Sequence, residues 1–543
     1  MTDSAVHNMV DYRATVRDFA WDVPARFNFA RDVVGGWARD PEQLAMLWLG
    51  ADGEERRLTF RDFAERADRV ARVLQRHGVR PGDRVMVQLP RVPAWWEVLL
   101  GCFQAGAVAV PGTVLLTPKD IAYRTQASEG VAYICDVENA AKVDEVRGEC
   151  PSLRTLFVSC AEAPSEGWRS LDREMEEAGG GAEAVDTLST DPALIYFTSG
   201  TVGNPKMVLH THSYPIGHHV TGRYWLDLRP GDLHLNLSET GWAKAAWSSL
   251  FGPWSTGAAL FVQDARGKFS ASETLDLLER YPITTFCAPP TAYRMLVLED
   301  LGARRLHSLR WCVGAGEPLN PEVIESWERG TGMVIRDGYG QTETVLLCGN
   351  FPSLDVRPGA MGMPSPGFEV GVIDDDARLV KPGAEGDIAV KVRPERPPGI
   401  FREYWRNAEA SEACLRGDWY VTGDRAVQDE DGYLWFVGRA DDVIISAGYR
   451  IGPFEVESAL VQHPAVAEAA VVAKPDEMRG TIVKAFCILG PGHDGSDTLV
   501  TELQEHVRTV TAPYKYPREI EFVTELPKTI SGKIRRVELR QQG

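Results

Sequence analysis

The feature that most restricts the fold is an alternation of helical and strand-like hydrophobic patterns along the N-terminal part of the chain. Residues 59–78 place apolar side chains at helical spacing, and residues 84–89 read as a strand. The same change of period recurs at 93–103 and 107–110 and continues to residue 158. Strands that alternate with helices are typical of parallel sheets covered by helices, so the pattern predicts an α/β fold.

The pattern changes twice toward the C-terminus, and 543 residues are enough for several units of about 100–200 residues. After residue 350, turns rich in proline and glycine separate short strands such as 369–373 and 387–392, which predicts an antiparallel β-subdomain. From about residue 440 a separate α/β pattern begins. We therefore expect a large N-terminal domain, 1–439, and a small mobile C-terminal domain, 440–543.

Composition argues against several classes of protein. The net charge of −19 disfavours a general nucleic-acid binder, because phosphate neutralisation needs basic surface. The apolar run 95–110 contains Glu97 and Gln104 and is too short for a membrane span. The chain does not open on a basic segment followed by an apolar one, so we expect no signal peptide. Nine cysteines without a C-x-x-C pair predict a reduced protein, and the expected location is the cytoplasm.

A glycine loop at 196–206, YFTSGTVGNPK, is the first candidate ligand site. The apolar run 193–197 reads as a buried strand that ends in two glycines, three hydroxyl side chains and Lys206. Glycines let the backbone approach a ligand, and successive N–H groups in such a turn form an anion-binding concavity. These residues suit a polyphosphate, although the pattern G-x-x-x-x-G-K-[ST] is absent here. An ordinary polar surface turn is the alternative.

Two further segments offer carboxylates. DGYGQTE, 337–343, places Glu343 beyond a flexible glycine turn, where it suits Mg²⁺, an ion that binds through one or two carboxylates plus phosphate oxygens. A helix-capping Thr/Glu pair is the alternative. YVTGD, 420–424, ends a strand with Asp424, which suits both hydroxyl groups of a ribose, although an ordinary strand-to-turn aspartate has the same pattern.

Three more segments carry glycine turns or basic side chains. GAGEPLN, 314–320, follows a predicted strand, and open α/β sheets bind ligands at such strand ends. Residues 438–452 contain Arg439 and Arg450 around an acidic pair. PKTISGK, 527–533, ends in Lys533 on a glycine loop, and a lone lysine of this kind is usually only solvated.

Together these segments resemble the adenylate-forming superfamily of acyl-CoA synthetases, luciferases and peptide-synthetase adenylation domains. The resemblance rests on TSGTVGNPK, GYGQTE, YVTGDRA, GRADDVIISAGYRIGPFEVE and PKTISGK in this order, and it extends over residues 40–540. SETGWAKAAW, FCAPPTAYRML, GAGEPLNPEV and VTAPYKYPREIEFV are similar to segments of the medium-chain acyl-CoA synthetases.

The resemblance implies two half-reactions at one site. A carboxylate attacks the α-phosphorus of ATP to give acyl-adenylate and pyrophosphate, and the CoA thiol then displaces AMP. Lys533, Glu343 and Thr198 are the implied catalytic residues, and Glu343 is also the implied Mg²⁺ ligand. The implied ATP contacts are Thr198, Ser199, Gly200, Thr201, Val202, Gly203, Asn204, Pro205, Lys206, Gly316, Glu317, Pro318, Asp337, Gly338, Tyr339, Gly340, Gln341, Thr342, Asp424, Arg439 and Lys533.

The resemblance also implies a rotation of the small domain about the hinge Asp441. This rotation withdraws Lys533, which bridges the acid and the α-phosphate, and brings the loop around Gly448 to the site. The implied CoA contacts are Ala447, Gly448, Tyr449, Arg450, Arg479, Tyr516, Pro517 and Arg518. One departure is Val114-Leu115-Leu116, which is apolar where mammalian medium-chain members carry a glutamine near CoA.

The implied acyl pocket includes Trp242, Lys244 and Gly340, with Trp247 and Leu347 as further candidates. Acetyl-specific relatives have a tryptophan at the position of Gly340, so glycine there predicts an acid longer than acetate. Lys244 is unusual in an apolar pocket and either extends outward or caps a polar tail. Glu239 leaves open a substrate with an ammonium group.

Three functions are compatible with the sequence. The first is an ATP-dependent ligase, with Mg²⁺, that joins a medium-chain, branched or aryl acid to CoA. The second loads a carrier-protein thiol instead, and the third is a nucleotide-binding regulatory protein without catalysis. The CoA-matching arginines favour the first function, and intact Lys533, Glu343 and Asp424 argue against the third.

Overall fold

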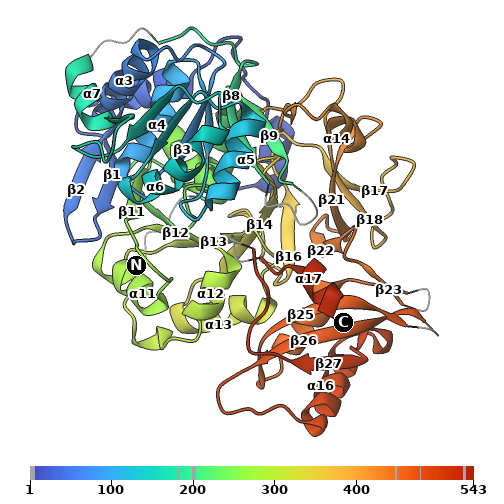
Figure 1. Ribbon diagram of the computed structural model, residues 1–543. Helices are drawn as coiled ribbons and strands as arrows, with labels where there is room; N and C mark the ends of the chain where they lie inside the picture. The colour runs from blue at the N-terminus through green and yellow to red at the C-terminus, as the bar shows by residue number, and fades with distance from the viewer. Residues whose placement is uncertain are drawn as a thin grey trace.

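The computed structural model describes residues 7–179, 184–198, 204–446, 449–476, 479–529 and 533–542. It consists of a large α/β lobe and a small C-terminal lobe, drawn in red in Figure 1. Parallel sheets flanked by helices form most of the large lobe, and antiparallel strands close it. The α/β class predicted from the alternating pattern is thereby confirmed.

An eight-stranded sheet carries the strand that leads into the glycine loop. Its pairs are parallel from β8 to β7, and β9 and β19 add an antiparallel edge. In spatial order the strands are β19 (Glu403–Tyr404), β9 (Met207–Thr211), β8 (Pro192–Phe197), β4 (Val108–Pro111), β3 (Arg84–Gln88), β5 (Ala132–Cys135), β6 (Thr155–Val158) and β7 (Trp168–Ser170). Their helices are α3 (Phe60–Arg76), α4 (Pro93–Gln104), α5 (Pro118–Ser128), α6 (Val137–Val146), η2 (Arg147–Glu149) and α7 (Leu171–Ala178).

Helix α3 shows how local sequence fixes these elements. Thr59 and Asp62 form a reciprocal capping box in which each side chain accepts a hydrogen bond from the other residue's backbone N–H. Apolar residues spaced by three and four, such as Phe63, Ala67 and Val70, are buried against the first sheet's core. The predicted helix at 59–78 is confirmed.

A second sheet is mostly parallel in its first part and continues as the antiparallel subdomain. Its first part comprises β2 (Glu55–Thr59), β1 (Leu44–Leu49), β11 (Ala259–Gln263), β10 (Leu233–Asn236), β12 (Thr285–Ala288), β13 (Trp311–Ala315) and β14 (Ile335–Gly340). Its helices are α8 (Tyr214–Val220), η3 (Thr221–Trp225), α9 (Ala243–Ala246), η4 (Trp247–Phe251), α10 (Gly252–Ser255), α11 (Ala271–Arg280), α12 (Pro290–Leu296), η5 (Leu301–Ala303) and α13 (Pro321–Thr331).

The antiparallel part extends this sheet from β14 toward the small lobe. Beyond β14, its strands are β15 (Leu346–Gly349), β16 (Ala360–Pro364), β22 (Leu434–Arg439), β21 (Trp419–Gln428), β18 (Glu385–Lys391) and β17 (Val370–Ile373), with β20 (Leu415–Arg416) beside β21. Helix α14 (Ala408–Ala413) precedes β20. The predicted antiparallel subdomain is confirmed, and it is continuous with the parallel sheet.

The small lobe has a hydrophobic core of its own, which includes Ile444, Val456 and Leu503. Its elements are β23 (Ile444–Ser446), β24 (Tyr449–Ile451), α15 (Pro453–Val461), β25 (Val466–Asp476), β26 (Gly480–Leu489), α16 (Asp497–Val510), η6 (Pro513–Lys515), β27 (Glu519–Phe522) and α17 (Arg536–Gln542). The side chain of Asn320 in the large lobe donates a hydrogen bond to Ser458 Oγ in the small lobe, at 3.1 Å. The domain boundary near residue 440 stays a prediction.

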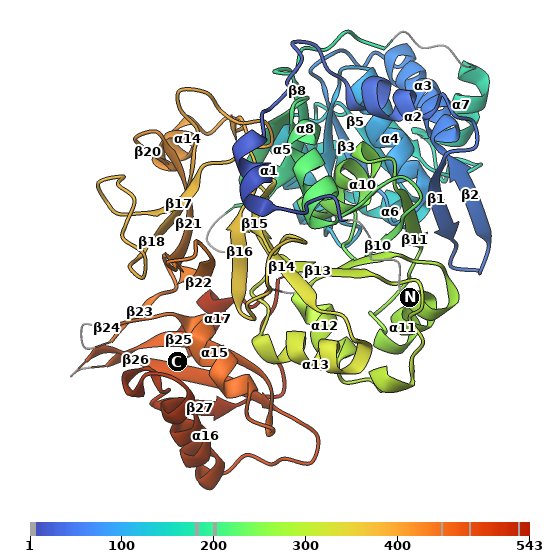
Figure 2. The same cartoon turned by 180° about the vertical axis from the view of Figure 1, so that it is seen from behind.

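The N-terminal arm crosses the large lobe on the side away from the small lobe's core. It contains α1 (Tyr12–Asp18), η1 (Phe29–Val34) and α2 (Gly35–Trp37), and Figure 2 shows α1 beside β15 and β16. Tyr12 Oη donates to the carbonyl of Pro364 at 2.8 Å, in β16. The backbone N–H of Asn8 donates to Asp227 Oδ1 at 2.8 Å.

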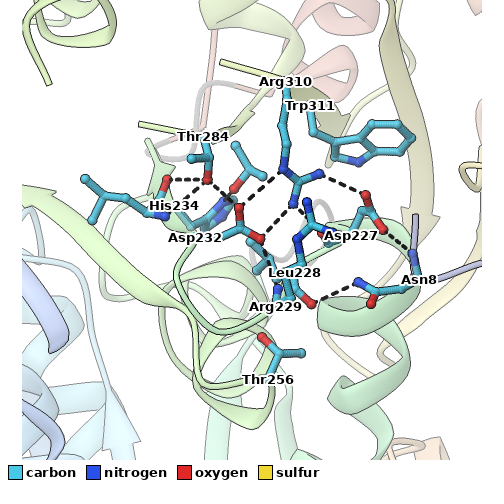
Figure 3. Close-up of polar contacts among 12 residues, drawn as sticks. Asn8, Asp227, Leu228, Arg229, Asp232, His234, Thr256, Thr284, Arg310 and Trp311 are labelled. Carbon is cyan, nitrogen blue, oxygen red and sulfur yellow. Dashed lines mark hydrogen bonds and ion pairs between the residues drawn. The ribbon is translucent and has the colours of Figure 1, made fainter. Parts of the chain in front are cut away.

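Arg310, which directly precedes β13, contacts Asp227, the residue that also accepts a hydrogen bond from Asn8 of the arm. Its guanidinium donates to Asp227 Oδ2 at 2.9 Å and to Asp232 Oδ2 at 2.7 Å (Figure 3). Both carboxylates are buried, so the paired arginine compensates charges that burial would otherwise destabilise. Arg310 directly precedes Trp311, the first residue of β13, and Gly316, the residue after this strand, lines the cavity described below.

All nine cysteines are free, and seven are buried, among them Cys102, Cys135 and Cys348. Their burial agrees with the interpretation of the cysteines as core residues. In the described part of the chain, no helix is both long and apolar enough to cross a membrane.

Candidate active site

A cavity of about 750 Å³ opens where the two lobes meet. Six of the segments predicted to bind ATP contribute to its wall. From the large lobe these contributions are Thr198, Asn204, Lys206, Gly316, Glu317, Pro318, Asp337, Gly338, Tyr339, Gly340, Gln341, Thr342, Glu343, Asp424 and Arg439, and from the small lobe Lys533.

Strand ends bring the segments of the large lobe together. Thr198 directly follows β8, and Gly316 directly follows β13. The neighbouring strand β14 pairs in parallel with β13 and ends at Gly340. Because chain segments leave these strands at their carboxyl ends, their polar residues gather at one edge, as expected for ligand sites of open α/β sheets.

The glycines of 337–343 do not form the flexible turn that the sequence suggested. Residues 337–340 belong to β14, and Gly338 is closely packed. A Cβ on Gly338 would lie 2.7 Å from the side chains of Trp225 and Leu346. Glycine is therefore required here for close packing beneath the cavity, and the strand holds the following residues in place.

The ends of the glycine loop are tied to each other. Thr198 N–H donates to the carbonyl of Lys206 at 2.9 Å, and Lys206 N–H donates to Thr198 Oγ1 at 3.1 Å. Tyr123 Oη donates to the carbonyl of Pro205 at 3.1 Å. Ser199, Gly200, Thr201, Val202 and Gly203 lie outside the described residues. The predicted loop thus leaves β8 and returns into β9 beside the cavity.

Asp424 is fixed by donors from β14 and by an arginine. Its Oδ2 accepts hydrogen bonds from Tyr339 Oη and Gln341 Nε2, each at 2.6 Å. Its Oδ1 lies 3.6 Å from Arg439 Nε, and the same arginine lies 3.6 Å from Asp441. Burial raises the pKa of Asp424, and the charge of Arg439 opposes that shift. The carboxylate is thus oriented before any ligand binds.

Glu343 lines the same cavity as Thr198 and Thr342, two residues that carry hydroxyl groups. Burial raises the pKa of Glu343, while a hydrogen bond from Tyr404 Oη lowers it. The described residues contain no cluster of three side chains able to hold a metal ion. A single carboxylate among hydroxyl oxygens fits Mg²⁺, which keeps most of its coordination for water and phosphate oxygens.

Lys533 reaches the cavity from the small lobe. Its backbone N–H donates to Thr529 Oγ1 at 3.1 Å, and its carbonyl accepts from Thr529 N–H at 2.7 Å. Helix α17 follows, and Arg536 in it donates twice to Glu457 of α15, each at 2.8 Å. The positive charge of Lys533 contributes to lowering the pKa of Asp424. The lobes are thus arranged with Lys533 facing the predicted ribose site.

The residues predicted to bind CoA lie elsewhere on the small lobe. Tyr449 and Arg450 are exposed on β24, and the ring of Tyr449 stacks on Tyr514 with centroids 4.3 Å apart. Arg518 Nη1 donates to Tyr516 Oη at 2.7 Å. Among the described residues of the predicted CoA set, which include Arg479 and Pro517, none lines the cavity, and Ala447 and Gly448 lie outside the described residues.

Trp247, a further candidate for the acyl pocket, packs directly against Gly340. A Cβ on Gly340 would overlap the indole of Trp247 and the backbone carbonyl of Val345. Glycine at this position therefore does not leave open space, because Trp247 occupies it. Trp247 is buried, and its Nε1 donates to Tyr214 Oη at 3.1 Å.

Lys244 and Trp242 flank this region on the segment after β10. Lys244 Nζ donates to the carbonyl of Ala315 at the end of β13, so the side chain extends toward the nucleotide side of the cavity. Burial lowers the pKa of Lys244, and Asp337 and Glu317 oppose that shift. Trp242 is half-buried at the start of α9 and does not border the cavity within the described residues.

Glu239 has a role in joining loops. Its Oε2 accepts from Gly241 N–H at 3.0 Å and its Oε1 accepts from Val114 N–H at 3.3 Å. The carboxylate is thereby engaged with backbone donors of two loops. This geometry argues against Glu239 as a partner for a substrate ammonium group.

Tyr404 is a residue of the site that the sequence patterns did not indicate. It lines the cavity, donates to Glu343 Oε1 at 2.8 Å and lies on the two-residue strand β19. The strand is too short for a periodic signal, and no glycine turn marks it. Only the three-dimensional neighbourhood of Glu343 reveals it.

Asp337 gives the site a pH-dependent effect on stability. Burial raises the pKa of Asp337 to about 8, against the opposing charge of Lys244. An unfolded aspartic acid titrates near pH ~3.9. Because the folded-state pKa is the higher one, the folded chain retains a proton that the unfolded chain releases. The stability associated with Asp337 is present below the unfolded pKa and is lost as the pH rises through about 8.

Asp337→Asn should remove this dependence, since the amide stays neutral. As the pH is raised from about 5 to about 8.5, we expect the difference between the melting temperatures, variant minus parent, to increase by a few degrees. Thermal unfolding without nucleotide measures the difference. Parallel curves for the two proteins would show that Asp337 does not control this window.

Two family profiles match the chain. The AMP-binding enzyme family matches residues 35–405, and the AMP-binding enzyme C-terminal domain matches residues 455–533. The chain belongs to the AMP-binding enzyme family. The family resemblance predicted from the motifs is thereby confirmed.

The relatives of this AMP-binding enzyme include acyl-CoA synthetases. Mitochondrial acyl-coenzyme A synthetase ACSM3 of Mus musculus is 47% identical over 545 residues, covering 98% of this chain and 94% of the relative. The crystal structure of the anthranilate CoA ligase AuaEII with anthranoyl-AMP has a TM-score of 0.88 at 33% identity, covering 96% and 98% of the two chains. A benzoate CoA ligase from Burkholderia xenovorans LB400 has a TM-score of 0.82 at 30% identity, covering 95% and 100%.

These comparisons confirm the predicted activity of the AMP-binding enzyme, an AMP-forming acid:CoA ligase of the medium-chain type that uses ATP and CoA. The predicted cytoplasmic location is wrong by the same comparison, because the curated relatives, ACSM3 among them, are mitochondrial. The prediction failed because cysteines that read as reduced do not distinguish compartments within a cell.

Proposed function

We propose that this ligase activates a medium-length, branched or aryl carboxylic acid by the combined action of Lys533, Glu343, Asp424 and the glycine loop. The observation that carries the proposal is the convergence of these residues, from both lobes, on one cavity. Lys533 comes from a segment more than 300 positions after the loop. Proximity in the sequence therefore does not bring these residues together; the fold does.

In the first half-reaction, the glycine loop with Lys206 holds the phosphates that leave as pyrophosphate. Asp424 accepts hydrogen bonds from the ribose, and Gly316 to Pro318 flank the adenine. Lys533 lies between the acid carboxylate and the α-phosphate, where it stabilises the negative charge that grows in the transition state. Positioning and charge neutralisation account for most of the catalysis in phosphoryl chemistry of this kind.

Glu343 would hold Mg²⁺, with water and phosphate oxygens completing the coordination. The fit rests on its part-buried carboxylate and on Thr198 and Thr342, two hydroxyl-bearing residues that line the same cavity. When bound, the ion neutralises phosphate charge. Tyr404 Oη donates a hydrogen bond to this carboxylate at 2.8 Å.

In the second half-reaction, the small domain rotates about Asp441. This rotation removes Lys533 and presents the loop around Gly448, with Tyr449, to the acyl-adenylate. Arg450, Arg479 and Arg518 supply charge for the phosphates of CoA. The exposed position of Arg450 on β24, away from the cavity, is what an arrangement poised for the first half-reaction requires.

The acid lies in the region bordered by Gly340 and Trp247. Trp247 packs against Gly340 from the apolar core, and Lys244 extends from the same segment to the carbonyl of Ala315. An aryl acid is supported by the similarity to the anthranilate and benzoate CoA ligases, and a medium-chain acid by the similarity to ACSM3. The CoA-matching arginines favour free CoA over a carrier-protein thiol.

The proposal is tested by pyrophosphate release across a panel of straight, branched and aromatic acids, followed by thioester formation with free CoA. We expect acid-dependent release that is strongest for acids longer than propionate, and a CoA thioester for the same acids. Release without thioester formation would point to a carrier-protein acceptor. No acid-dependent release would contradict catalysis altogether.

A further inference from the structure

Tyr404 connects two charged residues that come from different parts of the proposed triphosphate site. Its Oη donates to Glu343 Oε1 at 2.8 Å. The ammonium of Lys206 lies over its ring, 4.6 Å from the centroid. Only 5% of Tyr404 is exposed, while Glu343 is half-buried and Lys206 is exposed. One side chain therefore touches the implied metal ligand with its hydroxyl group and the loop lysine with its ring.

The backbone around Tyr404 ties it to both partners. Strand β19 pairs with β9, with Tyr404 opposite Val208, two residues after Lys206. Trp405 N–H donates to the carbonyl of Met207, and Phe401 N–H donates to the carbonyl of Glu343, each at 2.7 Å. The tyrosine is thus held in register with the end of the glycine loop and with the residue that it contacts.

The two contacts have different electrostatic consequences. The hydrogen bond from the Tyr404 hydroxyl group holds the orientation of the Glu343 carboxylate, whose oxygens are the kind of ligand that a divalent cation takes. The face of an aromatic ring attracts an ammonium group, more strongly where water is excluded. The hydroxyl group therefore acts on Glu343, and the ring acts on Lys206.

We infer that Tyr404 is a positioning residue that presents Glu343 to a divalent cation and Lys206 to the triphosphate. The inference rests on the proposed function, since it takes ATP with its metal as the ligand. It assigns separate effects to the hydroxyl group and the ring. Those effects can be measured without the acid and without turnover.

The test uses Mn²⁺ as the probe, with the full chain and ATP. Mn²⁺ binding followed by electron paramagnetic resonance reports the dissociation constant of the cation in the ATP complex. ATP binding without metal is measured by calorimetry. Glu343→Gln, which removes the carboxylate, sets the scale for complete loss of the ligand.

Tyr404→Phe keeps the ring and removes the hydroxyl group. We expect the Mn²⁺ dissociation constant to rise about tenfold, as for loss of one hydrogen bond to a charged group, while metal-free ATP affinity stays within about twofold. Tyr404→Leu removes the ring as well. We expect the same loss for Mn²⁺ and a further fall of about threefold or more in metal-free ATP affinity.

Tyr433 provides a matched control. It is also 5% exposed, its Oη donates to the carbonyl of Asp355 at 2.8 Å, and Arg357 lies 4.1 Å from its ring centroid. It does not line the cavity. Tyr433→Phe and Tyr433→Leu should therefore leave Mn²⁺ and ATP binding unchanged, even where they lower the melting temperature.

The outcomes separate the inference from the proposed function. Weaker Mn²⁺ binding in Tyr404→Phe with a melting temperature like the parent's supports the inference. Parent-like Mn²⁺ binding in this variant overturns it, and so does equal weakening in the Tyr433 variants. The proposed function depends on thioester formation by the parent enzyme, which is measured separately and stands or falls without Tyr404.

Discussion

Lys533→Ala should lower acid-dependent pyrophosphate release by about 10²- to 10³-fold, the usual effect of removing one group that stabilises transition-state charge. The structure places this lysine in the cavity with Asp424 and Glu343, where its charge already affects Asp424. If the small domain withdraws it before thioester formation, supplied acyl-adenylate and CoA should still react at close to the parent rate. Stopped-flow measurement of each half-reaction gives the two rates.

Lys528→Ala is the matched control for this experiment. Lys528 lies in the same C-terminal segment and does not itself line the cavity, and it pairs at 2.9 Å with Glu468, which does. Its loss should leave both half-reactions within about twofold of the parent, as expected for an exposed ion pair. An equal fall of both half-reactions in Lys533→Ala would contradict the proposed division of the two steps between two arrangements of the lobes.

Asp424→Ala should damage both half-reactions, in contrast to Lys533→Ala. ATP and acyl-adenylate share the ribose, so both lose the charged acceptor for its hydroxyl groups. Two such hydrogen bonds account for at least about 100-fold in kcat/KM for ATP. We expect a loss of similar size when acyl-adenylate is supplied with CoA at subsaturating concentration.

A stability measurement must accompany this variant, because Tyr339, Gln341 and Arg439 lose a shared partner. Asp429→Ala serves as control, since Asp429 follows the same strand β21 and pairs with Arg357 at 2.8 Å away from the cavity. A variant that stays folded and loses only the first half-reaction would show that Asp424 does not hold the ribose.

Periodicity and turn residues predicted much of the fold. The helix at 59–78 appears as α3, and the strand at 84–89 as β3, because both bury one consistent set of apolar side chains. The short strands after residue 350 appear as β17 and β18. That one sheet passes from parallel to antiparallel pairing through β14 and β15 could not be predicted, since strand pairing depends on partners distant in sequence.

The candidate site was predicted where short motifs carry the chemistry. Thr198, Lys206, Glu343, Asp424, Arg439 and Lys533 all reach one cavity, as the resemblance implied. The sequence did not predict which side chains pack against the glycines of this site. The DGYG segment reads as a turn in sequence, but contacts of Gly338 with Trp225 make it a strand. The place of Trp247 beside Gly340 likewise depends on two segments almost one hundred positions apart.

The contact between Gly340 and Trp247 has a consequence for protein engineering. Any side chain at position 340 meets the backbone carbonyl of Val345, which cannot move aside as a side chain can. At position 247 the obstacle is itself a side chain, and a smaller residue there would enlarge the space for the acid. Mutant libraries that aim at bulkier substrates therefore belong on the segment after β10, while the glycine of β14 should be kept fixed.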